Sequence, residues 1–305
     1  MAESQGTNPV NVSLVDIGKL SEPLTKLIEV VGKGTGIAYA PVSRVLQAKA
    51  DAKAKIILAN AEAKALSIQE RARQRVESQE IKRQTNLESI VAKAAMALPD
   101  SVSNDSVDED WIQQYVSHAQ DVSDSDMQII WARILAGEVA NPSSYSKRTL
   151  QFLKTLDKEE AEGFTKLCGL TLSFESGWLF ILSDDVTEKF VRETFKGSNF
   201  REHFCNIGLL APEPYIMHPS NMNGRHLKYF DQILSCRGPE KPRKGQGLDS
   251  IEDIIGGFNN FSQIGQELAK IAGAQPVEGY LQQLASHLDK EFKISLITEQ
   301  GVPLQ

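Results

Sequence analysis

Residues 119–138, AQDVSDSDMQIIWARILAGE, combine an acidic lead-in with an apolar stripe and a late glycine. Ser123 and Asp126 have the spacing of a capping box, and acidic side chains suit the positive end of a helix dipole. Gly137 and the following Asn141-Pro142 predict where the helix ends. One amphipathic helix is therefore expected, with its apolar residues at helical spacing: Met127, Ile130, Trp131, Ile134 and Leu135.

Further amphipathic helices flank this stretch. Ser106 and Glu109 fit a capping box for a preceding helix, Asp157 and Glu160 fit one for a helix over 158–169, and 146–156 forms a helix between them. Short connections favour antiparallel neighbours, so a helical bundle is expected over 106–169. Bundle core is favoured over a docking surface for the face made by Trp111, Tyr115, Met127, Ile130, Trp131 and Ile134.

Residues 44–98 contain neither glycine nor proline and are rich in Ala, Lys, Glu, Gln and Arg. They predict a single long helix of about 80 Å, at 1.5 Å per residue. A heptad register does not describe its apolar positions, but an eleven-residue register does, with Gln79 and Arg83 as exceptions. The expected oligomerisation seam consists of Leu46, Ala50, Ala54, Ile57, Ala61, Ala65, Ile68, Ala72, Val76, Leu87 and Ile90.

The alternative for this helix is a solvated single helix held by charge pairs. Its charge is also uneven, because residues 44–93 hold eleven Lys and Arg against six Asp and Glu, whereas the whole chain has a net charge of −7. Nucleic-acid or lipid contacts would use Arg71, Arg73, Arg75 and Arg83, although a solvated face is the favoured interpretation. The acidic excess of the rest of the chain argues against DNA as its ligand.

Residues 1–43 are expected to be a flexible segment containing a short amphipathic helix. Within 22–41, apolar residues recur on one face, followed by GKGTG. This glycine run lacks the spacing of a phosphate-binding loop. Docking of 22–41 and the basic helix on an anionic membrane surface remains an open alternative.

Residues 170–305 predict an α+β module. LTLSF and WLFIL, at 170–174 and 178–182, flank a turn and favour a hairpin, and a helix follows at 186–196. The order of helix and strands around His218–His226 is like that of winged-helix units. Residues 237–250 predict a loop rich in Gly, Pro and Lys; helices within 261–288 and a closing edge strand are expected after it. The whole chain is thus an α-rich α+β protein.

No sequence motif indicates catalysis. Cys205, His218, His226 and Cys236 lack the spacing of a metal site, and the cluster Asp108, Glu109 and Asp110 suits a helix start better than a cation. No cofactor is expected. Three cysteines, no membrane-length apolar run and no signal-peptide pattern favour a cytoplasmic protein, with attachment to the inner membrane as the alternative.

Three blocks carry a family resemblance: DVSDSDMQIIWARILAGEVANPSSYSKRTLQFLKTLDKEEAEGF (121–164), AKADAKAKIILANAEAKA (48–65) and FSQIGQELAKI (261–271). Together they resemble a bacterial domain-of-unknown-function family. The pattern DxxLQxxWARxLA with a late LTxxGxEL is also similar to the abortive-infection alpha group of phage-resistance proteins, with Phe261-Ser262 in place of Leu-Thr. The resemblance implies a setting in defence, and no catalytic residues.

The sequence therefore predicts a non-enzymatic, self-assembling cytoplasmic protein, with copies joined through the long helix and an unknown protein partner bound by the C-terminal module. The alternatives are a membrane-surface effector and a nucleic-acid-binding protein.

Overall fold

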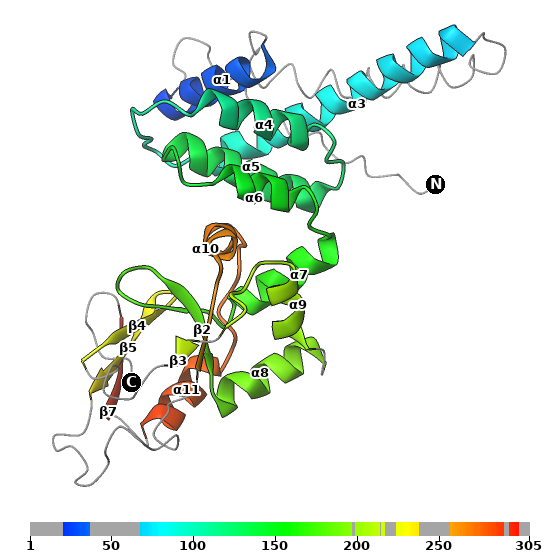
Figure 1. The fold of residues 1–305 in the computed structure, drawn as a ribbon. Helices are drawn as coiled ribbons and strands as arrows, with labels where there is room; N and C mark the ends of the chain where they lie inside the picture. The colour runs from blue at the N-terminus through cyan, green and yellow to red at the C-terminus, as the bar shows by residue number, and fades with distance from the viewer. Residues whose placement is uncertain are drawn as a thin grey trace, which may run out of the picture. The chain divides into compact units, whose positions relative to one another are not determined.

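The computed structural model describes residues 21–36, 68–196, 199–213, 215–216, 224–237, 257–289 and 293–298. The chain divides into two compact units, residues 1–150 and 151–305, called here the N-terminal and C-terminal units. Helices dominate the first and an antiparallel sheet with helices forms the second, so the predicted α-rich α+β class is confirmed (Figure 1). The upstream part of the predicted long helix, 44–67, lies outside the described residues.

The N-terminal unit is built from helices that pack in pairs, α3 against α5 and α1 against α4. At its centre, the indole of Trp131 is fully buried, and its ring meets that of Tyr115 edge-on at a centroid distance of 5.4 Å. The Tyr115 hydroxyl donates a hydrogen bond of 2.8 Å to the Trp131 carbonyl. The elements are α1 (Glu22–Thr35), α3 (Ile68–Ala97), α4 (Glu109–Ala119), α5 (Ser125–Ala140) and α6 (Lys147–Leu153), which crosses the boundary between the units.

Two helices are capped by aspartates instead of the serines that the sequence pattern favoured. Asp108, not Ser106, caps α4, and Asp124, not Ser123, caps α5. Each carboxylate accepts the backbone N–H of the third helical residue, and its charge also suits the helix dipole, which a neutral serine does not match. The capping box at Asp157 is confirmed.

Gly137 lies inside α5 and does not end it. A Cβ at this position would lie 2.8 Å from the Tyr145 ring, so the glycine lets the following loop fold back on the helix. The buried carboxylate of Glu138 holds the same loop, accepting the N–H groups of Ser143 at 2.7 Å and Tyr145 at 3.0 Å. Gly137, which was predicted to end the helix, is thus needed for close packing of the loop against α5.

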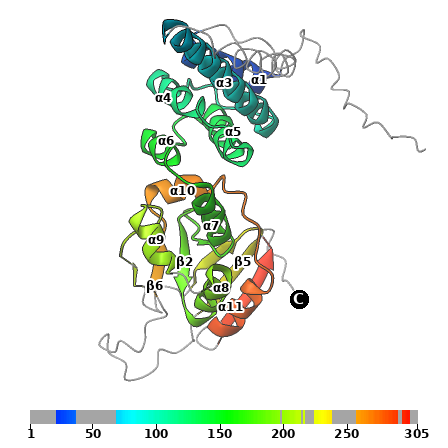
Figure 2. The same ribbon diagram turned by 90° about the vertical axis from the view of Figure 1, so that its right-hand side faces the viewer.

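The C-terminal unit contains an antiparallel sheet of order β3-β6-β2-β1-β4-β5-β7. Helices α7, α8 and α11 lie across one face of it (Figure 2). Its strands are β1 (Leu172–Ser173), β2 (Leu179–Ser183), β3 (Tyr215–Ile216), β4 (His226–Tyr229), β5 (Gln232–Arg237), β6 (Gly257–Asn260) and β7 (Lys293–Thr298). Its helices are α7 (Lys158–Cys168), α8 (Asp185–Phe195), α9 (Phe200–Asn206), α10 (Gln263–Ala269) and α11 (Tyr280–Leu288).

The predicted hairpin is present as β1 and β2, and β7 is an edge strand paired with β5. The strands on either side of residues 218–226 do not pair with each other: β3 pairs with β6, and β4 with β1 and β5. They therefore do not form the two-stranded wing that the analogy suggested. Helix α7, which the sequence grouped with the bundle, belongs to the C-terminal unit, where Phe164 packs against Phe204 and Phe261.

Candidate functional site

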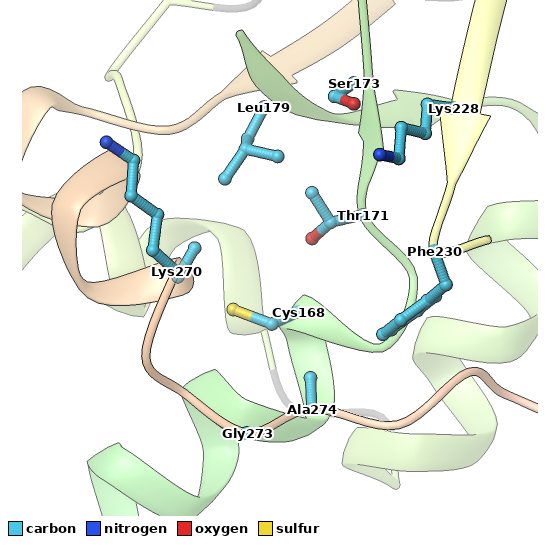
Figure 3. Close-up of a pocket in the computed structure, with 10 residues that line it drawn as sticks. Cys168, Thr171, Ser173, Leu179, Lys228, Phe230, Lys270, Gly273 and Ala274 are labelled. Carbon is cyan, nitrogen blue, oxygen red and sulfur yellow. The ribbon is translucent and has the colours of Figure 1, made fainter. Parts of the chain in front are cut away.

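A pocket of about 480 Å³ opens in the C-terminal unit, between the sheet and the end of α10 (Figure 3). Its polar lining comes from Thr171, Ser173, Lys228 and Lys270, and its apolar lining includes Phe230. Figure 3 shows the two lysines on opposite sides, with Thr171 and Cys168 between them. The described residues that line this pocket include two lysines and no Asp or Glu.

The Thr171 side chain is the most constrained polar group in this pocket. The residue is 9% exposed, and its hydroxyl oxygen is buried with no hydrogen-bond partner among the described residues. Figure 3 shows this oxygen turned into the space that the pocket encloses. A buried hydroxyl without a partner costs about 1–3 kcal/mol, so a group that pairs with it there would be favoured.

Cys168 presents a thiol to the same pocket. Burial raises the pKa of this thiol far above its ordinary value. The thiolate is the nucleophilic and metal-binding form of cysteine, so Cys168 stays a neutral, weakly polar group at neutral pH. The pocket thus offers charge and hydrogen bonds without an activated nucleophile at this position.

The Tyr229 hydroxyl connects two segments of the chain that line the pocket. The Tyr229 hydroxyl donates to the Gly169 carbonyl and accepts the Val277 N–H, both at 2.7 Å, which ties the end of α7 to the segment after α10. Desolvation by burial raises the pKa of Tyr229 to about 12, partly offset by the hydrogen bond from Val277. The phenol therefore remains protonated and able to donate throughout the neutral range.

The tail motif FSQIGQEL builds the α10 wall. The Gln266 side-chain amide accepts the Leu179 N–H at 2.9 Å and donates to the Leu179 carbonyl at 2.6 Å. It therefore pairs with β2 as the backbone of a neighbouring strand would. Ser262 caps the helix by accepting the Gly265 N–H and donates to the Gly208 carbonyl. These residues hold α10, whose carboxyl end supplies one lysine of the pocket, against the sheet.

Three residues of the DxxLQxxWARxLA pattern have structural roles. Asp124 caps α5, and Trp131 fills the core. The buried Gln128 accepts from Lys93 at 2.7 Å and donates to the Val122 carbonyl at 2.9 Å, joining α3 to the loop before α5. Of the face that the sequence predicted, Trp111, Tyr115, Met127, Trp131 and Ile134 are buried, while Ile130 is half-buried.

The structure divides the predicted oligomerisation seam into two parts. Leu87 and Ile90 lie in the unit's own core, where α3 packs on α5. Ile68 is 77% exposed and Val76 54% exposed, and Ala72 between them is exposed as well. The remaining seam positions lie outside the described residues: Leu46, Ala50, Ala54, Ile57, Ala61 and Ala65.

The arginines proposed for nucleic acid or lipid lie on α3. Arg73 pairs with Glu70 at 2.6 Å, and Arg83 pairs with Glu80 at 2.9 Å and with Asp121 at 2.8 Å. These contacts raise the pKa of both guanidinium groups, through hydrogen bonds to the carboxylates. The other two, Arg71 and Arg75, are exposed. Two of the four positive charges are thus already balanced within the chain.

The apolar face of α1 packs inside the N-terminal unit. Leu27 and Val31 are buried where α1 meets α4. Gly34 makes this contact close, since a Cβ there would lie 2.7 Å from Ile112. Gly34 of the glycine run thus serves helix packing, and the apolar face that lipid docking would need is covered. Within the described part of the chain, no helix has the length and apolarity to cross a bilayer.

The acid cluster at the start of α4 has local partners. Lys147 lies 3.0 Å from Asp108 and 3.6 Å from Asp110. In the C-terminal unit, the Cys205 thiol donates to a backbone carbonyl and Cys236 is buried in the sheet, whereas His218 lies outside the described residues. No metal-binding cluster occurs among the residues that the structure describes.

Replacing Asp108 with asparagine should lower stability at neutral pH and leave it unchanged in acid. Lys147, and secondarily the Trp111 N–H, lower the pKa of the Asp108 carboxyl below 3.8. Such a group stabilises the fold above its ordinary pKa, and this contribution is lost as the pH falls through the folded-state pKa. Asparagine remains a good N-cap. Urea unfolding of the variant and the parent should differ at about pH 7 and converge once the pH falls below the folded-state pKa of Asp108; a gap independent of pH would refute the charge effect.

Sequence reasoning missed the pocket residues. Their polar members come from residues 171–173, 228 and 270, far apart in the sequence, and form no short motif. The one usable signal was the FSQIGQELAKI block (261–271), which contains Lys270.

Comparison with known proteins gives a family match. The model of a family described as "Protein of unknown function (DUF2806)" matches residues 70–285. No curated protein and no solved structure matches the chain. The matched range contains α4, α5, the pocket and the tail motif.

Proposed function

We propose that this chain, which belongs to the DUF2806 family of proteins of unknown function, is a non-enzymatic cytoplasmic protein that assembles with copies of itself through α3 and binds a partner through its C-terminal unit. Membership confirms the resemblance to an uncharacterised family that the 121–164 block predicted. The observation that carries the proposal is the exposure of three positions of the predicted seam, Ile68, Ala72 and Val76, in the amino-terminal part of α3.

The surroundings of the predicted seam change along α3. In the eleven-residue register, Val76 and Leu87 are successive members of one series. Ile68, Gln79 and Ile90 are successive members of another. The later members are buried on α5, whereas the earlier ones are exposed where α3 extends beyond α4 and α5 (Figure 1). A helix held only by its own backbone bonds is marginal in water. The α3 helix of a second copy would cover the exposed seam positions, as α5 covers Leu87 and Ile90.

Charge supports a parallel pair of α3 helices. Arg71 and Arg75 lie on one flank of the Val76 position, and Glu77 and Glu80 lie on the other. A twofold axis parallel to the helices would place the arginine flank of one copy beside the glutamate flank of the other. Such an isologous contact closes on itself and produces a dimer.

Substituting both exposed apolar residues, Ile68→Glu with Val76→Glu, should weaken self-association of the full chain by at least about tenfold in dissociation constant. The introduced carboxylates would be desolvated in the pair and would repel their copies. Met96→Glu is the matched control, because Met96 is 80% exposed on the same helix outside the stripe. Sedimentation equilibrium measures the constants. A parent chain that stays monomeric at every concentration would overturn the proposal.

Charge reversal tests the parallel arrangement. The variant Arg71→Glu/Arg75→Glu and the variant Glu77→Arg/Glu80→Arg should each associate poorly, because like charges then meet across the axis. Mixed in equal amounts, they should form a heterodimer. Failure of the mixture to associate would contradict the pairing of these residues.

The antiviral setting is supported by the resemblance of the Trp131 helix and the tail motif to abortive-infection alpha proteins. It predicts that a bacterial host expressing the chain forms fewer phage plaques than a host carrying the empty vector. The Ile68→Glu/Val76→Glu variant should lose this protection if assembly is required. Equal plaque numbers with the parent chain and the vector, across diverse phages, would remove the antiviral part and leave self-assembly unaffected.

A further inference from the structure

Strand β7 forms one edge of the sheet, beside β5 (Figure 1). The hydrogen bonds of β5 show which residues of β7 face outward. The backbone N–H and carbonyl of Cys236 bond to Arg225 and Gly224, on the β4 side, and Cys236 lies opposite Ile294. Because the backbone groups of an antiparallel strand alternate in direction from one residue to the next, Ile294, Leu296 and Thr298 direct theirs away from β5.

Most of these outward groups are open to a further strand. The Asp289 carboxylate accepts the Ile294 N–H at 2.9 Å, which agrees with this direction. Within the described part of the chain, the Ile294 carbonyl, both backbone groups of Leu296 and the Thr298 N–H have no partner. Sheet edges are usually protected by proline or charged side chains, and residues 294–298 (ISLIT) contain neither. The edge is therefore suited to pairing with another strand.

The apolar face of the sheet also ends incompletely covered at β7. Leu296 lies opposite Leu234, and Ile294 lies opposite Cys236. The two β5 residues are buried, whereas the two β7 residues are half-buried. Directly opposite residues share one face of a sheet and pack together. A strand that placed an apolar residue opposite Leu296 would extend this packing by one more row.

The charges at the two ends of β7 match a second copy of the chain. Arg237 and Lys293 lie directly opposite each other at one end, which brings like charges together. At the other end, the exposed Asp231 lies in the turn between β4 and β5, and Glu299 follows β7 in the sequence. An antiparallel β7 of another copy, centred on Leu296, would bring the positive end of each edge to the acidic end of the other.

We propose that the β7 edges of two copies pair in antiparallel fashion about a twofold axis at Leu296, which joins two sheets into one. Each Leu296 exchanges both backbone hydrogen bonds with its counterpart, and the Thr298 N–H of each copy donates to the Ile294 carbonyl of the other. This register sets position 293 opposite position 299, where the sequence has lysine and glutamate.

Neighbouring registers are less favourable. The outward residues alternate, so the register can shift only in steps of two residues. One such shift would set Glu299 opposite Glu291, and the other would set it opposite Ser295. The pairing centred on Leu296 is isologous and lies in the C-terminal unit, so it is separate from self-assembly through α3.

Sedimentation equilibrium on the full-length Ile68→Glu/Val76→Glu variant tests this pairing with the α3 contact disabled. This variant should still dimerise. Adding Leu296→Pro should abolish the dimer, because proline removes the N–H that bonds across the axis, and this N–H takes no part in the ladder to β5. Leu296→Val, which keeps the N–H, is the matched control and should retain the dimer.

Two results would overturn the pairing. One is an Ile68→Glu/Val76→Glu chain that is monomeric at every concentration, which would leave the edge to a strand of a different protein. The other is a dimer that survives Leu296→Pro. If the α3 contact is the one that is absent, Ile68→Glu/Val76→Glu leaves association unchanged and Leu296→Pro alone removes it.

Charge exchange tests the register without altering the backbone. In the same background, Lys293→Glu should raise the dissociation constant of the dimer about tenfold, because a carboxylate then meets Glu299 on both sides of the axis. The same change sets a carboxylate opposite Arg237 within each copy, so it does not weaken the ladder to β5. Adding Glu299→Lys should restore the parent constant.

The matched control for charge exchange is Lys189→Glu, at an exposed lysine on α8, which should leave the dissociation constant unchanged. Circular dichroism verifies that each variant folds. A double variant that associates no better than Lys293→Glu alone would contradict the register centred on Leu296.

Discussion

Trp131→Ala is expected to lower the free energy of unfolding of the N-terminal unit by about 4 kcal/mol. The indole is fully buried between α4 and α5 and contacts the Tyr115 ring. Truncation removes its apolar area from the core and leaves a cavity that the surrounding helices cannot fill. The Tyr115 hydroxyl would also lose its rigid neighbour while still bonding the backbone carbonyl at position 131.

The effect can be separated into packing and polarity. The Trp131 indole N–H has no hydrogen-bond partner among the described residues, so Trp131→Phe removes a costly group as well as area and should lose only about 1 kcal/mol. Trp178→Ala is the matched control, because Trp178 is 48% exposed, and it should change stability by less than about 1 kcal/mol. Urea unfolding followed by circular dichroism measures all three. Equal losses for Trp131→Ala and Trp178→Ala would refute the central role of the buried indole.

Gly265→Ala should destabilise the C-terminal unit by about 3 kcal/mol or more. A Cβ at Gly265 would lie 2.1 Å from the Leu209 carbonyl oxygen, which belongs to the backbone and cannot move aside as a side chain can. The Leu209 carbonyl also accepts the Ser262 N–H, so shifting it would break the junction at the start of α10. The methyl group must therefore push α10 away from the fold.

The matched control is Gly163→Ala, a glycine inside α7 whose Cβ would lie 3.3 Å from the edge of the Phe204 ring. Alanine is the better helix former and the ring can give slightly, so stability should change by less than about 1 kcal/mol. Hydrogen exchange read on peptides from 257–289 measures the local effect of each variant. Unchanged protection of α10 in Gly265→Ala would show that the close approach to Leu209 is not required.

Local features of this chain were readable from its sequence. Helices α4 and α5 follow from apolar spacing and acidic starts, because these are properties of neighbouring residues along one helix. The exact caps were missed, since serine and aspartate both accept a backbone N–H and the pattern does not distinguish them. The meaning of Gly137 was missed for another reason: its packing against Tyr145 depends on how the loop after α5 folds back.

Long-range features were not readable in the same way. The pairing of β3 with β6 joins segments about forty residues apart, and no period in the sequence encodes it. The pocket depends on that sheet, because Thr171 and Lys228 become neighbours only when β1 and β4 pair. The tail motif was recognised as a resemblance, but its physical role in fixing α10 through Gln266 needed the structure.

The placement of the three tryptophans has a practical consequence for optical studies. Trp111 and Trp131 are buried in the N-terminal unit, whereas Trp178, in the C-terminal unit, already meets solvent. Denaturation of the first unit therefore shifts the emission spectrum strongly to the red, and denaturation of the second barely changes its wavelength. A melting curve recorded by tryptophan fluorescence alone would therefore report on the N-terminal unit. A screen based on it would overlook destabilising substitutions in the C-terminal unit, such as Gly265→Ala.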